Sequence, residues 1–134
     1  SIMANGTIAF DTLQTSDAKK SGTTQSLDTS YLYNGSAKVW INFNGEGTIA
    51  SRDTFNVGSI SDEATGDYQI NYTNNMGNAN YAPSGMSEGD GKVVIDDSAY
   101  SSHVTTSSLD IDVKTGGSKI DREVVCTIIH GDLA

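Results

Sequence analysis

Hydrophobic and polar residues alternate most regularly between Ser36 and Val57. Val39, Ile41 and Phe43 occupy every second position, and a period of two predicts a strand with one face packed on a core. Residues 44–47 combine asparagine and glycine, which tolerate positive φ and therefore predict a turn. The alternation resumes at residues 55–57. We therefore expect this stretch to form a hairpin or meander.

Short alternating runs recur along the rest of the chain at intervals of about 8 to 12 residues, the spacing of sandwiches and barrels. Gly58 predicts a bulge, and proline at position 83 predicts an edge strand because proline cannot donate to a ladder. Residues 61–66 suggest a turn. No segment sustains a helical period, so we expect little or no helix. The expected further strands are residues 67–73, 79–82, 92–96, 100–106, 109–113 and 120–130, the last being the longest apolar run and the expected central strand.

Residues 1–35 do not show this alternation. A few apolar side chains are scattered among polar ones. Such a segment cannot bury much surface by itself, which leaves disorder or an arm that packs on the main domain or on neighbouring subunits. We favour the arm, with short strands over residues 7–10 and 27–32, because a wholly polar tail would not need these apolar residues. The expected subunit-interface residues are Ile8, Phe10, Leu13, Leu27 and Tyr31.

These patterns predict an all-β chain with an extended arm over residues 1–35 and an antiparallel β-sandwich of jelly-roll-like form over residues 36–134. Hydrophobic residues make up only 36% of the chain, which suggests that the core is thin. A thin core and an amphipathic arm are both satisfied if three copies pack around an axis. We therefore expect an intertwined homotrimer.

The net charge of −9, with no basic run, argues against nucleic acid and anionic membranes as partners. Cys126 is the only cysteine, which rules out an intramolecular disulfide and a cysteine-based zinc site. The longest apolar run is far short of a membrane span, so we expect no membrane insertion. We expect the protein to be made in a cytoplasm.

Some residues invite a catalytic interpretation. His103 follows two serines, but neighbours on a strand point to opposite faces and do not form a nucleophile and base pair. Asp110 and Asp112 share a predicted strand face, where two carboxylates can bind calcium or, at a suitable separation, hydrolyse sugars. No motif supports either reading. We assign no catalytic, metal or cofactor residue and expect no enzymatic activity.

Aromatic residues can stack on sugar rings or pack in cores and interfaces. We expect Trp40, Tyr68 and Tyr72 to pack in the sandwich or in subunit contacts, because they lie in alternating strands. Polar, loop-rich sequence is a common setting for binding residues. The expected ligand-binding residues are Tyr81, Tyr100 and His103.

From about Gly35 to Asp132, several short sequence motifs in a fixed order resemble those of a domain that recurs in bacteriophage tail-fibre and other virion appendage proteins. The resemblance is moderately specific, and none of the motifs is catalytic. The motifs are Ala37-Lys38-Val39-Trp40, Asn42-Phe43-Asn44-Gly45, Gly47-Thr48, Arg52-Asp53, Phe55-Asn56-Val57, Gly66-Asp67-Tyr68, Asn80-Tyr81-Ala82 and Gly131-Asp132.

The resemblance implies a virion structural protein, typically trimeric, that acts as a tail-fibre or receptor-binding component. Its implied partners are copies of itself, other virion proteins, and a glycan or protein on the host surface. It carries over no binding residue, since variable loops make the contacts in such domains. Two alternatives remain open: a capsid fibre, decoration or adaptor protein without receptor binding, and a hydrolase acting on surface polysaccharide.

Overall fold

The computed structural model describes residues 9–14, 26–95 and 100–134. The chain divides into two compact units, Ser1–Ser36 and Ala37–Ala134. This division falls one residue after the boundary that the sequence predicts.

In the first unit, β1 (Thr12–Gln14) pairs antiparallel with β2 (Ser26–Asp28), which places Leu13 opposite Leu27. The α1 helix (Thr29–Gly35) follows at once. It begins where Asp28 Oδ1 accepts a hydrogen bond from the Ser30 amide at 2.8 Å, an N-cap that satisfies a backbone donor of the first turn. No residue of α1 is buried. The strand expected over residues 27–32 is therefore wrong: capping by Asp28 converts most of it to helix.

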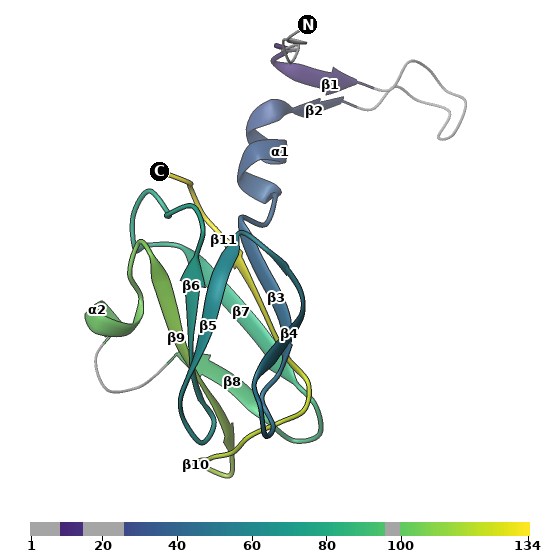
Figure 1. Ribbon diagram of the computed structural model, residues 1–134. Helices are drawn as coiled ribbons and strands as arrows, with labels where there is room; N and C mark the ends of the chain where they lie inside the picture. Colours follow the sequence, from purple (N-terminus) through teal and green to yellow (C-terminus); the bar gives the residue numbers. More distant parts are fainter. Residues whose placement is uncertain (1–8, 15–25, 96–99) are drawn as a thin grey trace, which may run out of the picture. The chain divides into compact units, whose positions relative to one another are not determined.

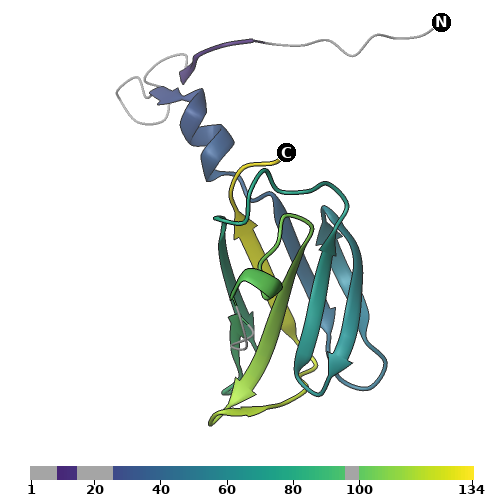
Figure 2. The ribbon, with the colours of Figure 1, turned by 90° about the vertical axis from the view of Figure 1, so that its left-hand side faces the viewer.

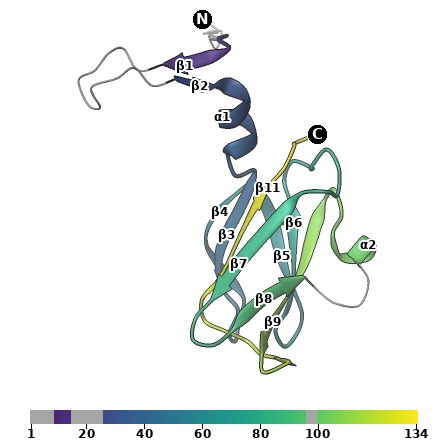
Figure 3. The same cartoon turned by 180° about the vertical axis from the view of Figure 1, so that it is seen from behind.

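The second unit is a sandwich of two antiparallel sheets (Figure 1). One sheet has the strand order β4-β3-β11-β7, and the other has the order β10-β9-β6-β5 with β8 also paired to β9. Figure 2 shows the strands of the two sheets running alongside each other, and Figure 3 shows β7 at the edge beside β11. The bounds are β3 Val39–Asn44, β4 Ala50–Phe55, β5 Val57–Ala64, β6 Asp67–Tyr72, β7 Ala82–Ser87, β8 Lys92–Ile95, α2 Tyr100–His103, β9 Ser108–Thr115, β10 Ser118–Lys119 and β11 Val125–His130.

The prediction of a mostly β, antiparallel sandwich with little helix is confirmed. The strand order differs from that of a jelly roll. The pairs β3–β4, β5–β6 and β8–β9 are consecutive strands that pair within one sheet, whereas successive strands of a jelly roll mostly alternate between sheets. β11 lies between β3 and β7, so the last apolar run does form an interior strand.

The core follows from the alternation in the strands. Val39, Ile41 and Phe43 of β3 are buried, as are the matching alternate residues of the facing sheet. Phe43 packs edge-on against Tyr68, with ring centroids 5.1 Å apart. The other buried apolar residues include Ile70, Tyr72, Met76, Tyr81, Val104, Leu109, Ile111, Val113, Val125 and Ile129. The sandwich thus has a core of its own. Of the three aromatic residues expected to pack in the sandwich or in subunit contacts, Tyr68 and Tyr72 belong to this core and Trp40 does not.

The Tyr68 hydroxyl links both sheets to a loop. It lies 2.9 Å from the Gly45 carbonyl and 2.9 Å from Asp121 Oδ1, which also accepts from the Gly66 amide at 2.7 Å. Burial raises the pKa of Tyr68 above its ordinary value, and the hydrogen bond to Asp121 adds to the shift. Gly45 and the Gly66-Asp67-Tyr68 motif therefore help to hold the two sheets and the loop together.

Three further expectations about single elements have clear outcomes. The bulge at Gly58 is confirmed by a register shift between Val57 and Ser59. The turn expected over residues 61–66 is shorter than predicted: β5 continues to Ala64, with a register shift between Asp62 and Ala64, and only residues 65–66 form the turn. The strand expected over residues 79–82 is displaced: the edge strand is β7, which begins at Ala82 and includes Pro83, and residues 79–81 are not part of a strand.

Residues 100–103 form α2, so the strand expected over residues 100–106 is also wrong. Val104 forms an isolated bridge with Leu109, and the Thr105 amide donates to the Ser108 carbonyl at 3.0 Å. This tight turn leads directly into β9.

Gly47 and Gly66 offer a matched test of the packing at the β5–β6 turn. Both have a φ of +63°, but a Cβ at Gly66 would lie 2.5 Å from the Ile120 amide, whereas nothing lies within 4 Å of one at Gly47. We expect Gly47→Ala to lower the free energy of unfolding by about 1 kcal/mol, the cost of the left-handed conformation. Gly66→Ala should cost at least about 3 kcal/mol, because backbone must also move. Urea unfolding of both variants gives the comparison; equal losses would contradict this close packing.

Candidate functional site

The outer face of the β4-β3-β11-β7 sheet is unusually apolar. Strand register aligns Phe55, Trp40, Ile128 and Ser84 across all four strands in one row. The neighbouring row contains Cys126 beside Met86 of the edge strand. Met86 is 76% exposed and Phe55 is 52% exposed. This face, which we call the Trp40 face, therefore presents large apolar side chains outside the core.

A groove of about 820 Å³ lies on the Trp40 face. Trp40, Met86, Cys126 and Ile128 line it, and Glu88 is the only charged residue in its lining. The lining also includes a few uncharged polar side chains, among them Asn42 and Ser84, but most of its surface is apolar. It suits an uncharged, apolar surface of another chain or segment.

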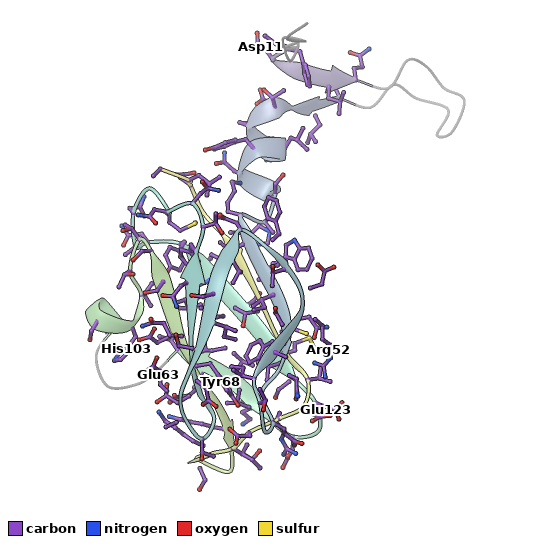
Figure 4. The ribbon with its side chains drawn as sticks, in the orientation of Figure 1. Asp11, Arg52, Glu63, Tyr68, His103 and Glu123 are labelled. Carbon is purple, nitrogen blue, oxygen red and sulfur yellow. The ribbon has the colours of Figure 1, made fainter. Side chains whose placement is uncertain are left out.

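Charged groups lie toward one end of the same sheet. Arg52 of β4 donates from Nη1 to the Glu123 carbonyl at 2.8 Å, and its Nη2 lies 3.5 Å from Glu123 Oε1 (Figure 4). The Glu123 amide donates to Glu88 Oε1 at 2.7 Å. The Glu88 carboxylate is thereby held at the rim by the segment that leads into β11.

The outer face of the opposite sheet is polar. Register aligns Ser61, Gln69 and Asp110 across β5, β6 and β9. His103 of α2 lies over this end of β9, with its Nδ1 2.8 Å from Asp110 Oδ2 (Figure 4). This pairing orients the imidazole, and the contact was not foreseen from the sequence because it joins a helix to a strand.

Asp112 is a structural carboxylate. It is fully buried, and its two oxygens contact Lys114 Nζ at 3.1 Å and Lys119 Nζ at 2.7 Å. Lys119 also lies 2.8 Å from Asp67 Oδ2. The hydrogen bond to Asp112 raises the pKa of Lys119. Asp110 and Asp112 share a strand face as predicted, but they have separate partners, and within the described residues no three His, Cys, Asp or Glu side chains are placed to hold a metal ion.

The three expected ligand-binding residues differ in their surroundings. Tyr81 is 6% exposed, and its hydroxyl lies 2.9 Å from each of the Tyr72 hydroxyl, the Thr105 carbonyl and the Ser108 carbonyl. Its ring therefore presents little surface to a ligand. Burial raises the pKa of Tyr72, as expected for a hydroxyl in this enclosed cluster. The Tyr100 side chain lies outside the described residues, and His103 is half-buried against Asp110.

The expected interface residues are exposed where the structure describes them. Phe10, Leu13, Leu27 and Tyr31 all belong to the first unit, and Tyr31 is 70% exposed. Ile8 lies outside the described residues. Leu32 and Tyr33 of α1 are exposed too, and the sequence analysis did not include them.

The Trp40 face was the feature that the sequence analysis missed. The signal was present, because Trp40 alternates out of phase with the buried residues of β3. Ile128 likewise alternates out of phase with the buried residues of β11. Only the strand register shows that the two side chains are neighbours.

A scan against protein-family models, a search of curated proteins and a search of solved structures each find no significant match to this chain. None of the described helices has the length and apolar character needed to cross a membrane.

Replacing Asp112 tests its structural role. Asp112→Asn removes the buried charge that Lys114 and Lys119 share, and should lower the free energy of unfolding by about 3 kcal/mol, toward the small end of the range for buried pairs because the lysines are partly exposed. Asp62→Asn, at an exposed position, is the control and should cost less than about 0.5 kcal/mol.

The same variant has a pH signature. Because the pKa of Lys119 is raised in the folded protein, its stabilisation is complete below the ordinary value of 10.5 and is lost as the pH rises through the higher folded value. The parent protein should therefore lose stability on the alkaline side more steeply than Asp112→Asn. Parallel alkaline profiles for the two proteins would contradict this assignment.

Proposed function

We propose that this chain is a non-enzymatic assembly and binding component of a virion appendage, of the tail-fibre or receptor-binding kind. One observation carries the proposal. In the described part of the first unit the large apolar side chains are exposed, whereas the sandwich buries a core of its own. A segment of this kind gains stability only when another surface covers it.

Self-assembly is the simplest way to supply that surface. Homo-oligomers with closed symmetry repeat one contact in every copy. A single exposed apolar segment per chain is therefore covered in every copy of the assembly. The proposed state is an intertwined homotrimer. Folding and assembly would then be coupled, since the first unit becomes fully stable only in the oligomer.

Binding at a host surface completes the proposal. Three copies would present three identical weak sites to a repetitive cell surface, and linked sites bind far more tightly than one. The proposed ligand is a glycan or protein on the host, and the proposed location is the virion. The sequence motifs that resemble those of tail-fibre proteins support this part of the proposal.

The described carboxylates give no support to a hydrolase. Asp112 is neutralised by two lysines, and Asp110 is engaged with His103. Sugar hydrolysis needs a pair of carboxylates that flank the scissile bond, one of them available to donate a proton.

Binding assays can distinguish the proposal from its alternatives. The purified chain should co-sediment with bacterial cells that carry the receptor, and should neither coat purified capsids nor release reducing ends from surface polysaccharide. A variant that lacks residues 1–35 should keep the melting temperature of the sandwich but bind cells at least tenfold more weakly, because avidity is lost. Binding to capsids alone would replace the proposal with a decoration role. Unchanged cell binding by the shortened chain would contradict the role of the first unit.

A further inference from the structure

The chain has two exposed apolar surfaces in its described part, and they belong to different units. One is the groove on the Trp40 face. The other is a short segment with exposed apolar side chains, which we call the α1 segment: Leu27 lies on β2, and Tyr31, Leu32 and Tyr33 lie on successive sides of α1, so that one side of the helix can face a partner at a time. We propose that the groove on one copy receives the α1 segment of a second copy. The inference rests on the proposed self-assembly and names the contact that produces it.

The dimensions of the two surfaces agree. A helix of seven residues is about 10 Å long, and an α-helix with its side chains is about 10 to 12 Å wide. The strands β3, β11 and β7 span about 10 Å across the sheet, since neighbouring strands lie about 4.8 Å apart. One short helix therefore covers the three strands that form the floor of the groove.

The charges also agree. The residues of α1 carry no charged side chain, and the groove lining contains only Glu88. Asp28, the N-cap of α1, and Glu88 are the only carboxylates that this contact brings near each other, although the whole chain has a net charge of −9. A strongly basic partner, which the net charge would attract, would find one carboxylate in a groove that is otherwise uncharged.

The side chains suit each other chemically. Tyrosine and leucine from the helix would meet tryptophan, methionine and isoleucine from the sheet, and aromatic side chains and methionine are enriched at interface cores. The tyrosine hydroxyls can remain at the edge of the contact, beside the polar side chains of Asn42 and Ser84 in the groove lining.

The single cysteine provides a direct test, because Cys126 lies in the groove and is partly exposed. Single variants Tyr31→Cys, Leu32→Cys and Tyr33→Cys sample the sides of the helix, and a disulfide needs Cα atoms within about 7 Å. After mild oxidation, at least one variant should give disulfide-linked chains on a non-reducing gel. Mixing chains of two tag lengths should give a product of intermediate size. The controls are Ser59→Cys, exposed on the other sheet, and the same helix variants with Cys126→Ser; neither should form the product.

Each other outcome overturns the inference in a distinguishable way. Cross-links confined to single chains would mean that the groove receives the α1 segment of its own copy. Absence of any cross-link, in a chain whose solution mass still shows an oligomer, would leave the proposed assembly standing and place its contact elsewhere. A monomeric chain without cross-links would remove both proposals.

A substitution in the groove gives an independent readout. Ile128 is 38% exposed, so Ile128→Asp should leave the melting temperature of the sandwich within a few degrees of the parent and weaken self-association at least tenfold. Ser59→Asp adds the same charge on the opposite sheet and should change neither property. Equal self-association of Ile128→Asp and the parent would contradict docking in this groove.

Discussion

The hydroxyl of Tyr68 links the parts of the sandwich that the rest of the structure depends on. It joins β6 to the loop after β3 through the Gly45 carbonyl, and to the segment before β11 through Asp121. The same carboxylate holds the Gly66 amide at the β5–β6 turn. A buried hydroxyl without partners would be costly, so the three contacts hold the two sheets in one relative position.

The two outer faces of the sandwich differ in chemistry. On the β5-β6-β9 side, Ser61, Gln69 and Asp110 give a polar surface that water can cover. On the other side, Trp40 and Ile128 lie in one row that water covers poorly. The first unit has exposed apolar side chains and little burial of its own. An account in which copies of the chain complete one another explains both features with one contact.

Much of the fold could be predicted from the period of the pattern. The alternation of Val39, Ile41 and Phe43 gives the strand, its inner face and the hairpin that follows it. Helix α1 was missed because seven residues are too few to establish a helical period, although Asp28 is a good N-cap.

The candidate site was harder to predict, because it depends on contacts between distant residues. Tyr81 has polar neighbours in the sequence but is buried, with its Cβ close against Gly131 and its hydroxyl bonded near Ser108. Trp40 was expected to pack in the sandwich or in subunit contacts because it lies in an alternating strand, but it lies outside the buried core. Nothing local shows that Ile128 lies beside it.

The proposed self-assembly can be tested by the solution mass of the full chain. Light scattering coupled to size exclusion, at several protein concentrations, gives that mass without any substitution. The account predicts a mass of three chains that persists on dilution. A mass of one chain at every concentration would contradict it, because the exposed apolar side chains of the first unit would then have no copy to cover them.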